Sequence, residues 1–206
     1  MVLFSALIYL VIALVLVHFE VFDLSLAKYG LPGWVVVVSA LLILFGSLVD
    51  IPLAIRGRGR QKKRDLKSLF FVNGRKKARK GLYLNLGGAI VPTIFSFYLL
   101  SQVSLVPALV SLFIVIILAR FLSGVSALKG NWLHLSAFIP LLAALGLAFL
   151  LVPANPAAVF YIAGTLGALI GAGLLNLDRI GEAPLFIGGR GMFHGIFIVN
   201  VVFLLL

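Results

Sequence analysis

Apolar runs of nearly membrane-spanning length recur along the whole chain, and they constrain its fold more than any other feature. A helix needs about 20 mostly apolar residues to cross the hydrocarbon core of a bilayer. Seven segments approach or reach that length: Val2–Phe19, Trp34–Ile55, Leu82–Leu100, Leu105–Val125, Trp132–Val152, Ala157–Leu177 and Met192–Leu206. The sequence therefore predicts an all-α integral membrane protein of about seven transmembrane helices, forming a single domain over residues 1–206.

Composition agrees with lipid as the solvent for most of the chain. Hydrophobic residues make up 63% of the sequence, against about 45–50% in soluble domains. A soluble fold of this size could not bury so much apolar surface. Cysteine is absent, which excludes disulfides, thiolate catalysis and cysteine-based metal sites.

Basic residues are concentrated in one connection, and they predict the topology. Twelve of the 17 Lys and Arg residues lie between Arg56 and Lys80. By the positive-inside rule this loop is cytoplasmic. Two predicted helices precede it, so the N-terminus is cytoplasmic too, and seven spans place the C-terminus outside.

The same loop is expected to bind anionic lipid headgroups. The residues assigned to that contact are Arg56, Arg58, Arg60, Lys62, Lys63, Arg64, Arg75, Lys76, Lys77, Arg79 and Lys80. We expect no nucleic-acid partner, because the formal charge of +11 belongs mainly to one loop. Within the loop, residues 56–81, Asn73-Gly74 is a hairpin turn signal. The loop is either a small β-hairpin on the membrane surface or disordered.

Strongly polar side chains gather near the cytoplasmic ends of several predicted helices. Ionisable and amide groups are costly in a membrane, so each is a functional candidate. The candidates for a cytoplasm-facing polar cavity are Asp50, Asn85, Arg120, His134, Asn176 and His194. The competing interpretation is that helix ends are polar anyway, because their side chains reach the interface and cap helices. We also predict that Asp50 and His194 approach one another or share water, with Asn85 and Asn176 as bridging amides.

Two G-x-x-x-G patterns predict close helix packing. One is Gly167 to Gly171 and the other is Gly191 to Gly195, on the last two predicted helices. Because this pattern lets helix backbones approach closely, the two helices are expected to form a tight pair.

The motifs of common enzymes are missing from the sequence. It contains neither H-E-x-x-H nor a Walker A pattern, and no two carboxylates lie deep on neighbouring predicted helices. We therefore predict no catalytic residues, no metal site and no cofactor, although an enzymatic activity stays open.

Several segments resemble a family of uncharacterised prokaryotic multi-pass membrane proteins, known only as a domain of unknown function. They include Gly46–Pro52, Asn85–Pro92, Gly164–Leu177 and Ile187–Phe197, the last matching I-G-G-x-G-x-F-x-G-I-F. The family pattern has acids where this chain has Gly173 and His194. Acids on two adjacent helices would resemble the layout of presenilin-type intramembrane proteases, and their loss here implies a member without that activity.

Three functions remain open from the sequence. The first is binding or transport of a small solute or ion in the polar cavity. The second is a non-catalytic relative of an intramembrane hydrolase that binds membrane peptides. The third is a structural or assembly subunit, with a second copy or another membrane protein as its partner.

Overall fold

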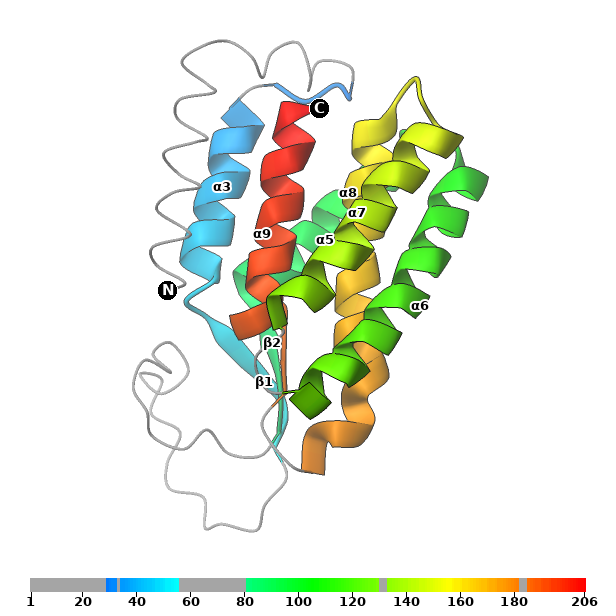
Figure 1. Ribbon diagram of the computed structural model, residues 1–206. Helices are drawn as coiled ribbons and strands as arrows, with labels where there is room; N and C mark the ends of the chain where they lie inside the picture. The colour runs from blue at the N-terminus through cyan, green and yellow to red at the C-terminus, as the bar shows by residue number, and fades with distance from the viewer. Residues whose placement is uncertain (1–28, 33, 56–80, 130–132, 182–184) are drawn as a thin grey trace.

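The computed structural model describes residues 29–32, 34–55, 81–129, 133–181 and 185–206. Over these ranges six α-helices run alongside one another, and a small sheet lies at one end of the bundle (Figure 1). The chain is mostly helical, as predicted. The first predicted helix, Val2–Phe19, falls outside the described residues.

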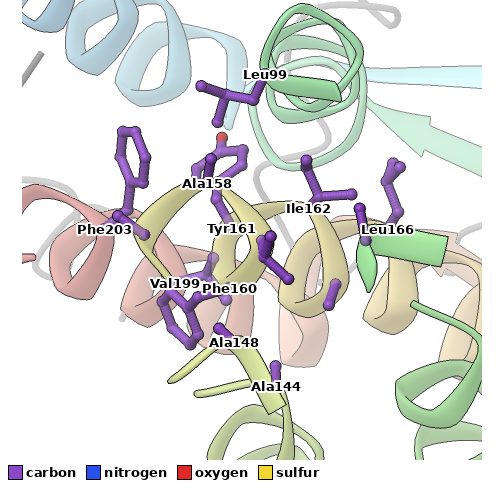
Figure 2. Packing of buried hydrophobic residues seen from close by; sticks show 14 of the residues in the cluster. Leu99, Ala144, Ala148, Ala158, Phe160, Tyr161, Ile162, Leu166, Val199 and Phe203 are labelled. Carbon is purple, nitrogen blue, oxygen red and sulfur yellow. The ribbon is translucent and has the colours of Figure 1, made fainter. Parts of the chain in front are cut away.

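Helix α8, Pro156–Ala168, forms the centre of the bundle. Every residue from Ala157 to Gly167 is buried. Figure 2 shows its side chains meeting those of three neighbouring helices. The helices that pack against α8 are α5 (Val91–Leu100), α6 (Leu105–Lys129), α7 (Leu133–Leu151) and α9 (Arg190–Leu205). Pro140 lies inside α7, and the helix continues past it to Leu151.

Large apolar side chains cover the outside of the bundle. Along α6 they follow one helical face, and Val106, Phe113 and Phe121 are 72%, 64% and 72% exposed. Residues at these spacings lie on one side of a helix. The centre of the bundle is also mainly apolar, with buried aliphatic and aromatic side chains, and it includes the polar residues Ser96, Ser111 and Thr165.

Two helical segments in the described part of the chain are long and apolar enough to cross a membrane. They are Leu105–Ser123, in α6, and Pro156–Leu177, which begins with α8. Leu86–Leu100 and Phe138–Leu151 are apolar but shorter. Two such segments give only a hint of membrane association, because the core helix of a soluble protein passes the same test. Seven spans are not supported by these lengths.

The second and third predicted helices differ from expectation. Helix α3 covers Trp34–Gly46 only, and the chain continues as strand β1, Asp50–Ile55, so the predicted helix to Ile55 is wrong. The next segment begins as strand β2, Gly81–Asn85, before turning helical. Pro52 has no N–H for a helical hydrogen bond, and it lies in the segment that became a strand.

The small sheet has the order β1-β2-β3, with β3 at Leu185–Ile187. Strands β1 and β2 are antiparallel, and Asp50 pairs with Asn85. Strands β2 and β3 are parallel. A sheet therefore exists, but its strands β1 and β2 flank the basic loop, whereas the hairpin is predicted inside the loop. The predicted turn at Asn73-Gly74 lies outside the described residues.

The glycine pattern that begins on α8, at Gly167, and ends just beyond it, at Gly171, faces a different partner from the one predicted. A Cβ at Gly167 would lie 2.5 Å from Val115 Cγ1, and one at Gly171 would lie 2.4 Å from the Ile116 carbonyl oxygen. Both contacts are with α6, so these two glycines do not mediate the predicted pairing, although α8 and α9 do pack against one another. Helix α9 instead meets Gly164, where a Cβ would lie 2.9 Å from Val199 Cγ2.

Candidate functional site

Four of the polar side chains predicted to converge lie toward one end of the bundle, namely those of Asp50, Asn85, Arg120 and Asn176. Strands β1 and β2, the end of α6 and the segment that follows α8 are all found there (Figure 1). That segment consists of a π-helix, η2 (Leu169–Gly173), and a 3₁₀ helix, η3 (Leu174–Gly181). The described side chains at this end form two separate hydrogen-bonded groups.

The first group centres on the side chain of Asn85, which is buried. Its Nδ2 donates to the Ser47 carbonyl oxygen at 2.9 Å, to the Val49 carbonyl oxygen at 3.4 Å and to Asp50 Oδ1 at 2.9 Å. Its Oδ1 accepts the backbone N–H of Gly88 at 2.7 Å. One amide thus joins the end of α3, the start of β1 and the next helical turn.

This arrangement follows from how the chain leaves α3. After Gly46 the helix stops, and the carbonyls beyond it need new donors. Asn85 supplies them from the paired strand, because the antiparallel register places it opposite Asp50. On its other side Asn85 caps a π-helix, η1, Leu86–Ile90. Asn is a favoured helix N-cap because its side-chain oxygen accepts a free backbone N–H.

Glycine backbones pack tightly around this amide. A Cβ at Gly46 would lie 2.7 Å from the Gly87 nitrogen, and a Cβ at Gly188 would lie 2.5 Å from the Gly88 carbonyl carbon. Gly188 also has φ of +72°, a conformation that favours glycine. A Cβ at Gly189 would lie 3.3 Å from Asp50 Oδ1. The start of α9 therefore lies directly beside the Asp50 carboxylate.

The second group joins α6 to η3. Arg120 Nη1 donates to Asn176 Oδ1 at 3.1 Å, and Asn176 Nδ2 donates to Ser123 Oγ at 3.0 Å. The same Nδ2 is 3.2 Å from the Gly171 carbonyl oxygen and 2.9 Å from that of Ala172. Asn176 thus satisfies carbonyls of the π-helix η2, much as Asn85 does at the end of α3.

The two groups divide the predicted cavity residues. Asp50 is bonded to Asn85, and Arg120 is bonded to Asn176. The described hydrogen bonds of Asn176 therefore do not reach the Asp50 group, although a bridging role would require it. His134 and His194 lie in α7 and α9, but their side chains fall outside the description. The approach of Asp50 to His194 stays a prediction, as does the cavity. The predicted headgroup residues lie between 56 and 80, also outside it.

Sequence reasoning missed the partners that complete these groups. They are the carbonyls of Ser47 and Val49 and the hydroxyl of Ser123. Serine is common in apolar segments, and every residue has a backbone carbonyl, so the sequence does not indicate which of these groups will accept a hydrogen bond. The breaks at Gly46 and Gly87-Gly88 were the available signals.

A third set of polar contacts was also missed, at the opposite end of the bundle. Tyr29 Oη donates to Asn155 Oδ1, and Tyr98 Oη donates to the Tyr29 carbonyl oxygen at 2.6 Å. Burial raises the pKa of Tyr29 to about 12, so the phenol stays protonated and can donate. These bonds tie the chain before α3 to α5 and to the α7–α8 connection.

One family model matches the chain, over residues 44–206, and its description is "protein of unknown function (DUF1614)". The chain belongs to this family. The match includes both hydrogen-bonded groups and confirms the resemblance to a domain of unknown function. Neither a curated protein nor a solved structure matches the chain.

Proposed function

We propose that this chain, as a member of that family, is a multi-span membrane protein that binds and passes a small solute or ion at its polar end. The observation that carries the proposal is an outer surface of large apolar side chains together with buried polar amides. Large apolar residues such as Phe113 and Phe121 face outward on α6. Polar groups such as Asn85 and Asn176 are buried.

The outward apolar surface favours lipid as its neighbour. Soluble monomers rarely expose a contiguous apolar patch larger than a few hundred Å², whereas α6 is lined with exposed apolar residues from Val106 to Phe121. The proposed topology has seven spans, with the N-terminus and the 56–81 loop in the cytoplasm and the C-terminus outside. The proposed location is the cell membrane.

The polar end is the proposed place of binding. Asp50 is the only carboxylate, and Arg120 the only cation, whose side chain is within the described residues. Each is held by an amide, at 2.9 Å and 3.1 Å respectively. Irregular backbone at membrane depth persists where it is buried in protein or lines a wet cavity, and η1 and η2 are such irregular segments. π-Helical turns are also frequent at functional sites.

Ion flux through reconstituted protein tests the proposal. Purified chain in liposomes containing a pH-sensitive dye, with an imposed potassium diffusion potential, is expected to admit protons faster than empty liposomes. Asp50→Asn keeps the side-chain shape and removes the charge, so it should abolish this flux. Asp65→Asn is the matched control and should retain it. Equal fluxes with and without protein, or an undiminished flux in Asp50→Asn, would contradict the proton-coupled form of the function.

A structural or assembly role is the second candidate, and one observation favours it. The described hydrogen bonds of Asn85 and Asn176 go largely to backbone groups freed where helices break. Such amides serve helix packing without any ligand. In this case Asp50→Asn should leave the protein folded and its function unchanged, whereas loss of Asn85 should impair folding.

A further inference from the structure

One buried hydroxyl in the middle of the bundle has no hydrogen-bonding partner among the described groups. Thr165, on α8, is 0% exposed, and its Oγ1 makes no hydrogen bond within the part of the chain that the structure describes. A buried hydroxyl without a partner is costly, and nearly all such groups bond either to the protein or to an internal water. The surroundings of Thr165 therefore indicate which partner it takes.

Contacts between α5 and α8 fix the way in which the two helices face one another. They are antiparallel, because the end of α5 and the start of α8 are both hydrogen-bonded to Tyr29. Further along, Phe95 meets Tyr161 edge-on, with the ring centroids 5.1 Å apart. Thr165 is one helical turn beyond Tyr161, so both residues lie on the same side of α8.

A second contact fixes the level of Thr165 along the bundle. Toward the polar end, Ala89 and Leu169 belong to one buried cluster. Thr165 lies midway along α8 between this contact and the aromatic one, and Pro92 lies midway between them on the facing chain. Thr165 and Pro92 are therefore level with one another, and both are buried.

This level carries polar groups on α5 as well. Ser96, one turn from Pro92, is 0% exposed, and its Oγ donates to the Pro92 carbonyl oxygen at 2.8 Å. A hydroxyl oxygen that donates one hydrogen bond can still accept another, and a carbonyl oxygen has two lone pairs. Pro92 has no N–H, so one carbonyl in the preceding turn lacks its helical donor. Acceptors on α5 and an unpaired hydroxyl on α8 thus share one buried level.

We propose that an internal water molecule binds between α5 and α8 at this level. It accepts the Thr165 hydroxyl and donates to Ser96 Oγ or to the Pro92 carbonyl oxygen. Buried waters typically make about three hydrogen bonds to polar groups that are otherwise unsatisfied. In membrane helices, ordered waters and Ser or Thr side chains commonly restore the bonds that a proline removes. Thr165, Ser96 and Pro92 carry no charge that would balance an ion, so water is the ligand that fits.

The water site has a consequence for the interior of the bundle. One turn along α8, Tyr161 Oη donates to Asn200 Oδ1 at 3.1 Å, and both side chains are buried. The cluster around Leu169 separates Thr165 from the Asn85 group. Water beside Thr165 shortens the apolar distance that a solute would have to cross between the polar end and the Tyr161–Asn200 pair. This consequence rests on the proposed function, whereas the water site does not.

Magic-angle-spinning NMR of the full chain in lipid bilayers tests the site directly, because the sequence contains only two threonines, Thr93 and Thr165. Thr93 is half-buried, on the side of α5 that carries the exposed Phe97, and is the internal control. With isotope-labelled threonine, magnetisation from water protons is expected to reach the Thr165 methyl group more strongly than the Thr93 methyl group. Transfer to Thr165 that is absent, or no stronger than transfer to Thr93, overturns the proposal.

Thermal unfolding of two matched variants in detergent provides a second test, since Thr→Val removes the hydroxyl and nearly keeps the shape. Thr165→Val should lower Tm by about 2–4 °C, the shift expected when a buried hydrogen bond is lost in a chain of this size. Thr93→Val should leave Tm unchanged. A hydroxyl that has no partner in solution predicts an unchanged or higher Tm for Thr165→Val, which would overturn the site.

The two measurements together separate the remaining alternatives. A lower Tm in Thr165→Val without water transfer to Thr165 would assign the partner of the hydroxyl to a carbonyl of its own helix, and would also overturn the water site. Water transfer to Thr165 in a protein that shows no proton flux would preserve the water site and refute only the transport function.

Discussion

At the residue scale, Asn85 and Asn176 have the same structural role in two places. Asn85 ends strand β2 beside the break after α3, and Asn176 lies in the irregular segment after α8. Each donates to backbone carbonyls of the neighbouring irregular backbone. A buried polar group left unsatisfied costs about 1–3 kcal/mol. These two amides therefore stabilise breaks that an apolar interior would not tolerate.

Replacing Asn176 with Ala is expected to lower stability for that reason. It removes the acceptor of Arg120 Nη1 and the donor to the Gly171 and Ala172 carbonyls. We expect the free energy of unfolding to fall by about 2–4 kcal/mol, since several buried groups lose a partner. Thermal unfolding in detergent measures it. The control is Gln102→Ala, an exposed residue whose side chain donates to Ser101 Oγ, and equal losses in both variants would contradict this role.

At the element scale, the described helices α6, α7, α8 and α9 could be predicted closely, but the α3–β1 and β2–η1 segments could not. Long apolar runs identify helices because nothing in them competes with helical hydrogen bonding. Trp34–Ile55 is just as apolar, yet it changes to a strand after Gly46. At that point Gly46 packs against Gly87, far along the chain, where a Cβ at Gly46 would lie 2.7 Å from the Gly87 nitrogen. A local sequence pattern cannot predict such a contact, and it cannot predict that Gly171 packs against α6.

The close approach of η2 to α6 yields a matched pair of substitutions. Gly171→Ala places a Cβ 2.4 Å from the Ile116 carbonyl oxygen, whereas a Cβ at Gly146 meets nothing within 4 Å. Overpacking of this kind costs about 1–3 kcal/mol. Gly171→Ala should therefore lower Tm clearly. Gly146→Ala should leave it unchanged or raise it, because Ala is the better helix former by about 0.5–1 kcal/mol. Equal behaviour of the two variants would refute the close contact.

At the scale of the whole molecule, the exposed apolar side chains and the two asparagine-centred groups at one end fit the membrane protein proposed above. Exposed Phe and Val residues on α6 lie where lipid would be. The polar groups lie at the end of the bundle that borders the basic segment of the sequence. The site could be predicted from the sequence only as a set of residues at similar depth. Its division into two groups depends on the strand pairing and on the 3₁₀ segment after η2, neither of which the periodicity indicated.

Accessibility of single cysteines to a membrane-impermeant maleimide tests the membrane arrangement most directly, because the native chain contains no cysteine. Gln102→Cys, in the connection between α5 and α6, should be labelled in intact cells, and Lys62→Cys only after the membrane is permeabilised. Phe113→Cys, at a position 64% exposed on α6, should be labelled in neither case because lipid covers it. Labelling of Phe113→Cys as readily as Gln102→Cys would mean that water covers this face, and labelling of Lys62→Cys from outside intact cells would reverse the topology.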